Sequence, residues 1–243
     1  MNGMIYVVGL GPGDISMMTG EARTAIENSD TIVGYRVYTE LISELCRGKD
    51  VIESGMRQER ERCKKCVELA KQGHTVALIC SGDAGVYGMA SPLLEIADEE
   101  GFDDVVIVPG VTAALSGAAR LGAPIGHDFC VISLSDLLTP WELIEKRLKS
   151  AAEADFCIVI YNPTSHKRSD HLERARDIML TTIPGDRPCG FVKNIGRDGM
   201  ETATCRLSEL SDDMVDMFTT VFIGNSNTKI CNGRLVTPRG YRQ

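Results

Sequence analysis

The sequence of 243 residues lacks any long hydrophobic run. Its longest apolar stretches, such as residues 156–160, have the length of a strand, whereas a membrane-spanning helix needs about 20 apolar residues. The first residues also lack the basic and apolar regions that form a secretory signal peptide. We therefore expect a cytoplasmic protein that has no membrane partner.

An excess of positive charge is missing as well. The chain carries 34 Asp and Glu against 26 Lys and Arg, which gives a net charge of −8. A nucleic-acid-binding protein needs a basic face, so we expect no nucleic-acid partner. A small anionic ligand remains compatible with this charge, because a local group of arginines can hold carboxylates on an acidic protein.

The nine cysteines include one CxxC pair, Cys63-Lys64-Lys65-Cys66, and no second pair. A zinc or iron–sulfur site would need more ligands at matching spacing, so we predict no metal site. Because no export signal is present, the thiols are expected to be reduced and buried. Cys63 and Cys66 are interpreted as structural residues of a charged helix.

Short β-branched runs alternate with helical patterns along the chain, which predicts an α/β fold of two α/β domains with a ligand-binding cleft between them. In the first half this alternation implies crossover connections and a mainly parallel sheet. The segment 122–126 is interpreted as a hinge, so the domains are expected at 1–123 and 124–243. The predicted strands cover 5–8, 31–33, 75–80, 105–108, 129–134, 156–161, 189–192, 201–205 and 220–223, and the predicted helices cover 17–28, 57–72, 91–100, 112–120, 141–150 and 171–180.

A glycine-rich turn, Gly9-Leu10-Gly11-Pro12-Gly13-Asp14, directly follows the first predicted strand. Such a turn lets a ligand approach the backbone closely. Pro12 has no N–H to offer a phosphate, and Asp14 places a negative charge where a phosphate would lie. No acid follows the second strand, where Gly34-Tyr35-Arg36 stands instead, and a P-loop lysine is missing. These features disfavour a dehydrogenase and favour a ligand such as S-adenosylmethionine.

Three further turns follow predicted strands in the same way: residues 81–88, 109–114 and 161–163. Asp83 lies at the carboxyl end of its strand, where an open α/β sheet binds its ligand, and its carboxylate can accept from an amine or a ribose hydroxyl. The start of a helix after Pro109-Gly110 offers backbone N–H groups. Four such turns on two domains predict a single ligand site.

In this order, the motifs GLGPGD, SGDAGVYG, PGVTAA and YNP resemble the tetrapyrrole (corrin/porphyrin) methylase superfamily over almost the whole chain. The resemblance implies a homodimer of two-domain subunits that binds S-adenosylmethionine between the domains. It assigns cofactor contacts to Pro12, Ser81, Gly82, Asp83, Val86, Thr112, Ala113 and Asn162, with looser matches at Ile195, Gly196 and Asn225.

Five segments resemble the C17-methyltransferase branch of this superfamily: 34–38, 55–59, 161–168, 224–228 and 237–241. The branch implies a C-methyltransferase of cobalamin biosynthesis that methylates C17 of a tetrapyrrole, precorrin-3B or cobalt-precorrin-3, with contraction of the ring. Other hypotheses are a C11 or C20 precorrin methylase, a diphthine or rRNA methylase, and a non-catalytic S-adenosylmethionine sensor. The sequence leaves open whether the substrate already carries cobalt.

Methyl transfer from a sulfonium depends mainly on alignment of the reacting atoms. Ring contraction would be helped by an acid or base, for which the candidates are Glu59, His127 and His166. The branch also implies many substrate carboxylates, which guanidinium and ammonium groups would bind. The candidates beside the predicted turns are Arg36, Arg57, Lys167, Arg168 and Arg197.

Overall fold

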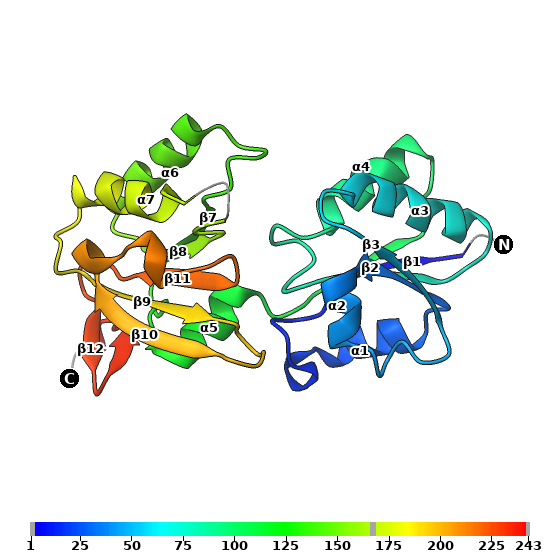
Figure 1. The fold of residues 1–243 in the computed structure, drawn as a ribbon, viewed down its shortest axis with the longest axis horizontal. Coiled ribbons are helices and arrows are strands. Elements are labelled where there is room, and N and C mark those ends of the chain that lie inside the picture. Colours follow the sequence, from blue (N-terminus) through cyan, green and yellow to red (C-terminus); the bar gives the residue numbers. More distant parts are fainter. Residues whose placement is uncertain (1–2, 166–168, 242–243) are drawn as a thin grey trace. The chain divides into compact units, whose positions relative to one another are not determined.

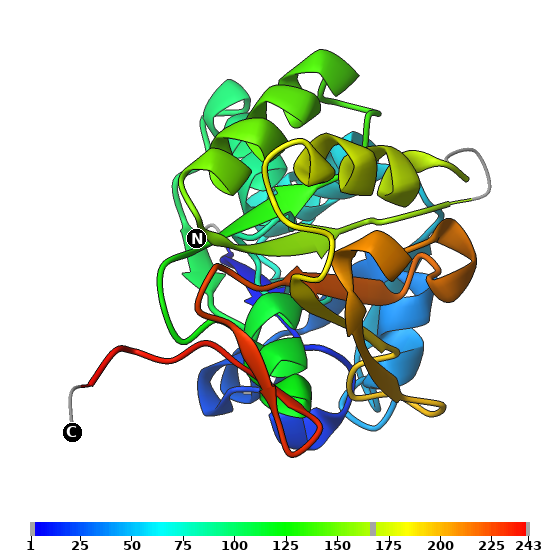
Figure 2. The same ribbon diagram turned by 90° about the vertical axis from the view of Figure 1, so that its left-hand side faces the viewer.

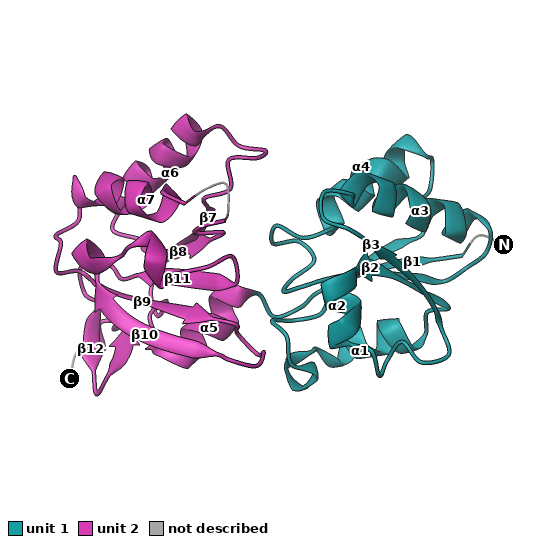
Figure 3. Ribbon diagram, viewed as in Figure 1, with its two compact units in different colours: residues 1–112 teal, residues 113–243 magenta. Residues whose placement is uncertain are grey.

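The computed structural model describes residues 3–165 and 169–241. The chain divides into two compact units, Met1–Thr112 and Ala113–Gln243, which Figure 3 shows in separate colours. Each unit has its own five-stranded sheet and its own buried apolar clusters. The units are described one at a time.

The sheet of unit 1 is entirely parallel and has the strand order β3-β2-β4-β1-β5. Its central strand β4 is buried along its whole length, because helices cover both faces. The mainly parallel sheet predicted for the first half is therefore confirmed. The strands are β1 (Ile5–Gly9), β2 (Thr31–Tyr35), β3 (Asp50–Ser54), β4 (Val76–Cys80) and β5 (Val105–Val108).

Helices α1 (Gly20–Glu27) and α2 (Arg36–Leu41) cover one face of this sheet, and α3 (Glu59–Lys71) and α4 (Ala90–Glu99) cover the other (Figure 1). A short 3₁₀ helix, η1 (Ile15–Met17), precedes α1. After β1 the chain continues to α1 on one face of the sheet, and after the neighbouring strand β4 it continues to α4 on the opposite face. In open α/β sheets such a switch point opens a crevice at the carboxyl ends of the strands.

Local sequence explains where these helices begin and which faces they bury. The Thr19 hydroxyl accepts the backbone N–H of Ala22 at 3.1 Å and caps α1. Along α3, the inward positions include Cys63 and Cys66, both fully buried. Burial raises the pKa of the Cys63 thiol to about 11 and also raises that of Cys66. The CxxC pair therefore packs in the core as protonated thiols.

The sheet of unit 2 is mixed, with the strand order β10-β9-β11-β8-β7. Strands β7 and β8 are parallel and are joined through helix α6, whereas the other neighbouring pairs are antiparallel. The strands are β7 (Phe129–Ser133), β8 (Cys157–Tyr161), β9 (Pro188–Lys193), β10 (Glu201–Arg206) and β11 (Thr219–Ile223).

Helices α6 (Trp141–Glu153) and α7 (His171–Leu180) cover one face of this sheet, and α5 (Ala113–Leu121) covers the other (Figures 1 and 2). Small residues let α5 pack closely. A Cβ added to Gly117 would lie 2.9 Å from the Phe222 ring. Two 3₁₀ helices, η2 (Leu207–Glu209) and η3 (Asp212–Met214), lie between β10 and β11.

A second, three-stranded sheet of unit 2 contains the first two residues of the segment 122–126 that the sequence suggested as a hinge. Its strands are β6 (Gly122–Ala123), β12 (Lys229–Cys231) and β13 (Arg234–Val236), and β13 pairs with β6 in parallel. Because α5 packs on β9, β10 and β11, the division between the units falls after Thr112 and differs from the predicted boundary after residue 123. Within the described ranges, we find no helix that is both long and apolar enough to span a bilayer.

Candidate functional site

Three loops meet at the carboxyl ends of β1, β4 and β5 in unit 1, where their backbones come into direct contact. A Cβ added to Gly110 would lie 2.1 Å from the carbonyl oxygen of Gly82 and 2.5 Å from that of Gly9. A Cβ on Gly9 would lie 2.7 Å from the same Gly82 oxygen. Only glycine permits this approach, so the three loops that the sequence singled out lie together at one edge of the sheet.

Hydrogen bonds fix the first two of these loops to each other. The backbone N–H of Gly11 donates to the carbonyl of Gly82 at 3.0 Å, and the N–H of Gly82 donates back to Gly11 at 2.8 Å. Both residues have a positive φ, +82° at Gly11 and +70° at Gly82, which glycine adopts without strain. The turns after β1 and β4 therefore form one rigid backbone surface.

The Asp83 carboxylate joins the second loop to the third. Its Oδ1 accepts the N–H of Gly85 at 2.8 Å, and its Oδ2 accepts the N–H of Gly110 at 3.0 Å. An ionised carboxylate has about four acceptor sites, so Asp83 keeps acceptor capacity for an amine or a hydroxyl of a ligand. Asp83 is thus a structural link and remains suited to the contact predicted for it.

The other predicted cofactor contacts of unit 1 lie at this same edge of the sheet. Pro12 is buried in the loop after β1, while Ser81, Val86 and Thr112 are partly exposed. A Cβ on Gly82 would come within 3.8 Å of the Thr112 Cα, so the second and third loops run close together. The structure brings all six predicted residues of unit 1 to one edge.

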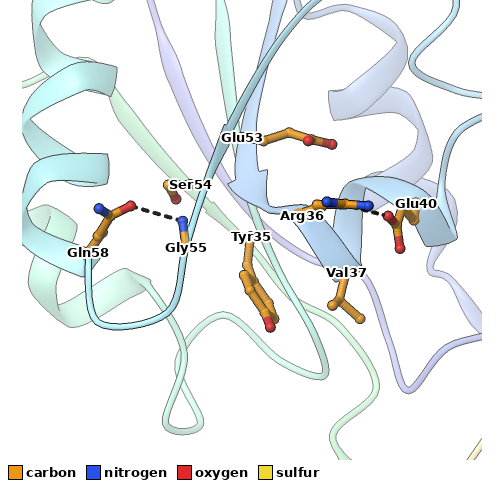
Figure 4. A pocket seen from close by; sticks show the side chains of 8 residues that line it. All are labelled: Tyr35, Arg36, Val37, Glu40, Glu53, Ser54, Gly55 and Gln58. Atoms are coloured by element: carbon orange, nitrogen blue, oxygen red, sulfur yellow. Dashed lines mark hydrogen bonds and ion pairs between the residues drawn. The ribbon is translucent and has the colours of Figure 1, made fainter.

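A pocket of about 540 Å³ lies at the carboxyl ends of β2 and β3 in unit 1 (Figure 4). Arg36, a predicted substrate contact, lies in this pocket, where its Nε is 2.9 Å from Oε1 of Glu40. The hydrogen bond and the charge of Glu40 raise the pKa of Arg36. A ligand carboxylate must therefore compete with Glu40. The pocket is lined by Tyr35, Arg36, Val37, Glu40, Glu53, Ser54, Gly55 and Gln58.

The turn after β3 and the start of α3 contain two further predicted residues and one that the sequence did not single out. Arg57 is exposed and left-handed, with φ +64°, and Glu59 begins α3. Arg62 is buried, and its guanidinium donates to the Ser54 hydroxyl at 2.6 Å and to the Gly55 carbonyl at 3.0 Å. Arg62 thus supports the pocket wall. Its helical spacing from Cys66, four residues on, could have shown that it points inward.

In unit 2, Asn162 follows β8 in a left-handed conformation, with φ +52°. Its Nδ2 donates to the Ser133 hydroxyl at 2.9 Å, so the loops after the parallel strands β7 and β8 are joined. Ile195 and Gly196 follow β9. The end of β9 pairs with the start of β11, and the start of β11 pairs with the end of β8. Together with Ala113 at the start of α5, these predicted residues lie at one edge of the sheet.

Asn225 lies at the opposite edge of this sheet, because it follows β11, whose last residue Ile223 pairs with Ile158 near the start of β8. Asn225 is buried, and its Oδ1 accepts the N–H of Asn227 at 3.0 Å and the hydroxyl of Thr228 at 3.3 Å. The structure therefore separates Asn225 from the other predicted contacts of unit 2 and gives it a role in its own turn.

Two of the remaining candidates, His127 and Arg197, lie apart from each other in unit 2. His127 precedes β7, at the edge away from Asn162, and its Nδ1 lies 3.7 Å from Oδ2 of Asp128. Arg197 is partly exposed, and its Cζ lies 5.5 Å from the centre of the Phe218 ring. The candidates His166, Lys167 and Arg168 lie outside the described residues.

The family model of the Tetrapyrrole (Corrin/Porphyrin) Methylases matches residues 4–211. The chain belongs to this family. The matched range includes the four motifs, and the resemblance inferred from the sequence is confirmed. The predicted class, a C-methyltransferase, is likewise supported by the family and by its relatives.

Two curated relatives and one solved structure are similar to this methylase over nearly its whole length. A "Probable cobalt-factor III C(17)-methyltransferase" of Salmonella typhimurium is 47% identical, with 98% of this chain and 99% of the relative covered. A "Precorrin-3B C(17)-methyltransferase" of Sinorhizobium sp is 39% identical, with 99% and 98% covered. The crystal structure of the methyltransferase CobJ has a TM-score of 0.92 and 36% identity, with 97% and 100% covered. These likenesses confirm the predicted α/β class of this methylase fold.

Proposed function

We propose that this methylase transfers a methyl group from S-adenosylmethionine to C17 of a cobalt-bearing tetrapyrrole, cobalt-factor III, with contraction of the ring, in cobalamin biosynthesis. The observation that carries the proposal is the 47% identity to a relative of that name over 98% of this chain and 99% of the relative. A relative named for precorrin-3B is 39% identical, so precorrin-3B is the second candidate substrate.

The loops of unit 1 fit S-adenosylmethionine. Gly9, Gly82 and Gly110 let the three loops pack backbone against backbone, which fixes the edge of the sheet where the cofactor would lie. Asp83 can accept from an amine or a ribose hydroxyl with its remaining lone pairs. We assign cofactor contacts in unit 1 to Pro12, Ser81, Gly82, Asp83, Val86 and Thr112, and in unit 2 to Ala113, Asn162, Ile195 and Gly196.

S-adenosylmethionine supplies a methyl group on a sulfonium, which an electron-rich tetrapyrrole carbon can attack directly. The protein's part is then alignment, which can lower a barrier by several kcal/mol, about 7 in well-oriented cases. Rigid backbone contacts such as the paired Gly11 and Gly82 suit this task. Glu59, at the same sheet edge as the pocket, is the favoured acid or base for the contraction step.

The substrate carboxylates would bind to arginines, and Arg36 in the pocket of Figure 4 is the best placed of them. A carboxylate arriving there would replace Glu40 as the partner of the guanidinium. Arg57 on the neighbouring turn is exposed and available for a second carboxylate. Arg197 is the corresponding candidate in unit 2. We further propose that the enzyme acts as a cytoplasmic homodimer.

The test is incubation of the purified protein with S-adenosylmethionine and either cobalt-factor III or precorrin-3B, followed by mass spectrometry. We expect a product one methyl group heavier, with the new methyl at C17, and an equal amount of S-adenosylhomocysteine. Methylation at C11 or C20 would identify another methylase of the family. S-adenosylmethionine binding without turnover on either substrate would support a sensor instead.

A further inference from the structure

The loop of residues 137–140 lies between β7 and α6, and the residues at both of its ends contact one buried side chain, His171. Before the loop, Oδ2 of Asp136 lies 3.3 Å from Nε2 of His171. After the loop, the ring of Trp141 meets the imidazole edge-on, with 4.7 Å between the ring centres. His171 is 5% exposed, whereas the Asp136 side chain is 39% exposed, so the histidine side of this contact is shielded from water.

Further contacts fix His171 and Trp141 themselves. Nδ1 of His171 lies 3.1 Å from Oδ1 of Asp170, so a carboxylate oxygen lies near each ring nitrogen. The guanidinium of Arg174 lies over the Trp141 ring, 4.0 Å from its centre. Asp212 accepts the backbone N–H groups of the two residues after His171 and holds the start of α7. The end of the loop is thus built on a rigid base.

The segment that leads into the loop is bonded to the turn of Asn162, a proposed cofactor contact. The Ser133 hydroxyl accepts from Asn162 at 2.9 Å and from the N–H of Ser135 at 3.2 Å. Leu134 is fully buried, and its N–H donates to the Tyr161 carbonyl at 2.9 Å. The loop therefore starts beside the residues that would hold the methyl donor.

This fixed loop exposes two adjacent large apolar side chains. Leu138 is 98% exposed and Leu137 is 62% exposed. Single exposed leucines are common on protein surfaces, but two together on a loop with buried anchors indicate a binding surface.

We propose that Leu137 and Leu138 bind a face of the substrate macrocycle, and that His171 is a positioning residue that holds them in place. This inference rests on the proposed function. A tetrapyrrole is broad, flat and largely apolar on its faces, with its carboxylates at the rim. It therefore offers the apolar contact that the two leucines need, on a loop that starts beside the Asn162 turn. A loop free to move would lose part of this contact energy in becoming ordered.

The test uses the single tryptophan of the chain, Trp141, as a reporter of tetrapyrrole binding. The Kd of cobalt-factor III is measured by quenching of Trp141 fluorescence, and the KM and kcat by methyl transfer. For the double variant Leu137→Ser/Leu138→Ser we expect the Kd and KM for the tetrapyrrole to rise about tenfold, as expected for loss of partial burial of two leucines. The kcat and the affinity for S-adenosylhomocysteine should stay unchanged.

Two further variants separate positioning from contact. His171→Phe keeps an aromatic ring against Trp141 but loses both carboxylate contacts, and Asp136→Ala releases only the front of the loop. Both should raise the KM with little change in kcat. Ile230→Ser, which changes an exposed apolar residue on β12 of unit 2, is the matched control and should leave the KM unchanged.

The outcomes distinguish this inference from the proposed function. A double variant that binds cobalt-factor III as tightly as the wild type would overturn the inference. A double variant that binds as tightly and has a changed oligomeric state would show that the loop contacts a second copy of the chain, which would also overturn it. If cobalt-factor III quenches the fluorescence of the wild type but no methyl group is transferred, the proposed function is refuted. The Kd values of the wild type and of the double variant would then still decide whether the two leucines bind the macrocycle. Absence of wild-type quenching and of methyl transfer would refute both.

Discussion

The phenol oxygen of Tyr161 accepts a hydrogen bond from the backbone N–H of Ala114 at 2.6 Å. Tyr161 is the last residue of β8, and Ala114 lies in the first turn of α5. The bond satisfies one of the N–H groups that a helix leaves unpaired at its start. It also fixes the start of α5 to the strand that ends beside Asn162.

Replacement of Tyr161 by Phe should destabilise the protein by about 1–2 kcal/mol, because the buried N–H of Ala114 loses its partner. We also expect several-fold weaker binding of S-adenosylhomocysteine, since Ala113 and Asn162 flank this bond. Urea unfolding and calorimetry measure the two effects. Tyr241→Phe, at a residue that is 84% exposed, should change neither quantity. Equal stability of Tyr161→Phe and wild type would contradict the prediction.

Replacement of Asp83 by Ala should cost about 2 kcal/mol of stability, since two backbone N–H groups lose a charged acceptor. The Kd for S-adenosylhomocysteine should rise as well. Asp14→Ala is the matched control, because the hydrogen bonds of Asp14 are to Ser16 within its own exposed turn. We expect this control to keep wild-type ligand affinity. Unaltered ligand binding by Asp83→Ala in calorimetry would remove Asp83 from the set of cofactor contacts.

Replacement of Gly110 by Ala should be among the most damaging single changes in unit 1, with a loss of about 3 kcal/mol or more. The new Cβ would lie 2.1 Å from the Gly82 carbonyl oxygen, so backbone would have to move. Gly20→Ala adds the same atom where no other atom lies within 4 Å, at the first residue of α1. That control should be neutral or slightly stabilising in thermal unfolding. Similar melting temperatures for the two variants would show that the loops can move apart with little loss of stability, and would contradict the prediction.

The stability contributed by Asp155 should depend on pH. Burial acts to raise the pKa of this carboxyl, but two hydrogen bonds from Ser226 and the ion pair with Arg187 outweigh it and leave the pKa below its ordinary value of 3.8. A lowered folded pKa means that the contribution is complete above pH ~4 and is lost as the pH falls through the folded value. The wild type should therefore be more stable than Asp155→Asn by a constant margin from about pH 5 to 7, and this margin should shrink in more acidic solution. Asparagine tolerates the left-handed backbone of residue 155, so this variant isolates the charge. A margin independent of pH would contradict this account.

Local sequence patterns were sufficient to predict four of the five strands of unit 1 and the loops that follow β1, β4 and β5. These strands are short, buried β-branched runs, and parallel strands place all their carboxyl ends at one edge of the sheet. The meeting of Gly9, Gly82 and Gly110 follows from that geometry. Strand β3 was missed because its sequence, DVIES, has charged residues and lies at the sheet edge, where burial imposes no apolar pattern.

The grouping of residues in unit 2 could not be predicted in the same way. Each of β9, β10 and β11 can pair in either direction, and sequence periodicity does not encode that direction. Asn225 was therefore grouped with Asn162, although the antiparallel pairing of β11 with β8 carries it to the other edge. His171 was also missed, because its partners Asp136 and Trp141 lie far from it in sequence and only the packing of α6 on α7 brings them together.

The chain leaves unit 1 once, at the peptide bond between Thr112 and Ala113, and does not return. Each half of the molecule is therefore encoded by an uninterrupted stretch of the gene and completes its own sheet without borrowing a strand from the other half. Synthesis on the ribosome would deliver every strand of the first sheet before the first residue of α5 is made. A circularly permuted or split form of the protein, with its new ends between Thr112 and Ala113, would keep all ten strands of the two large sheets intact.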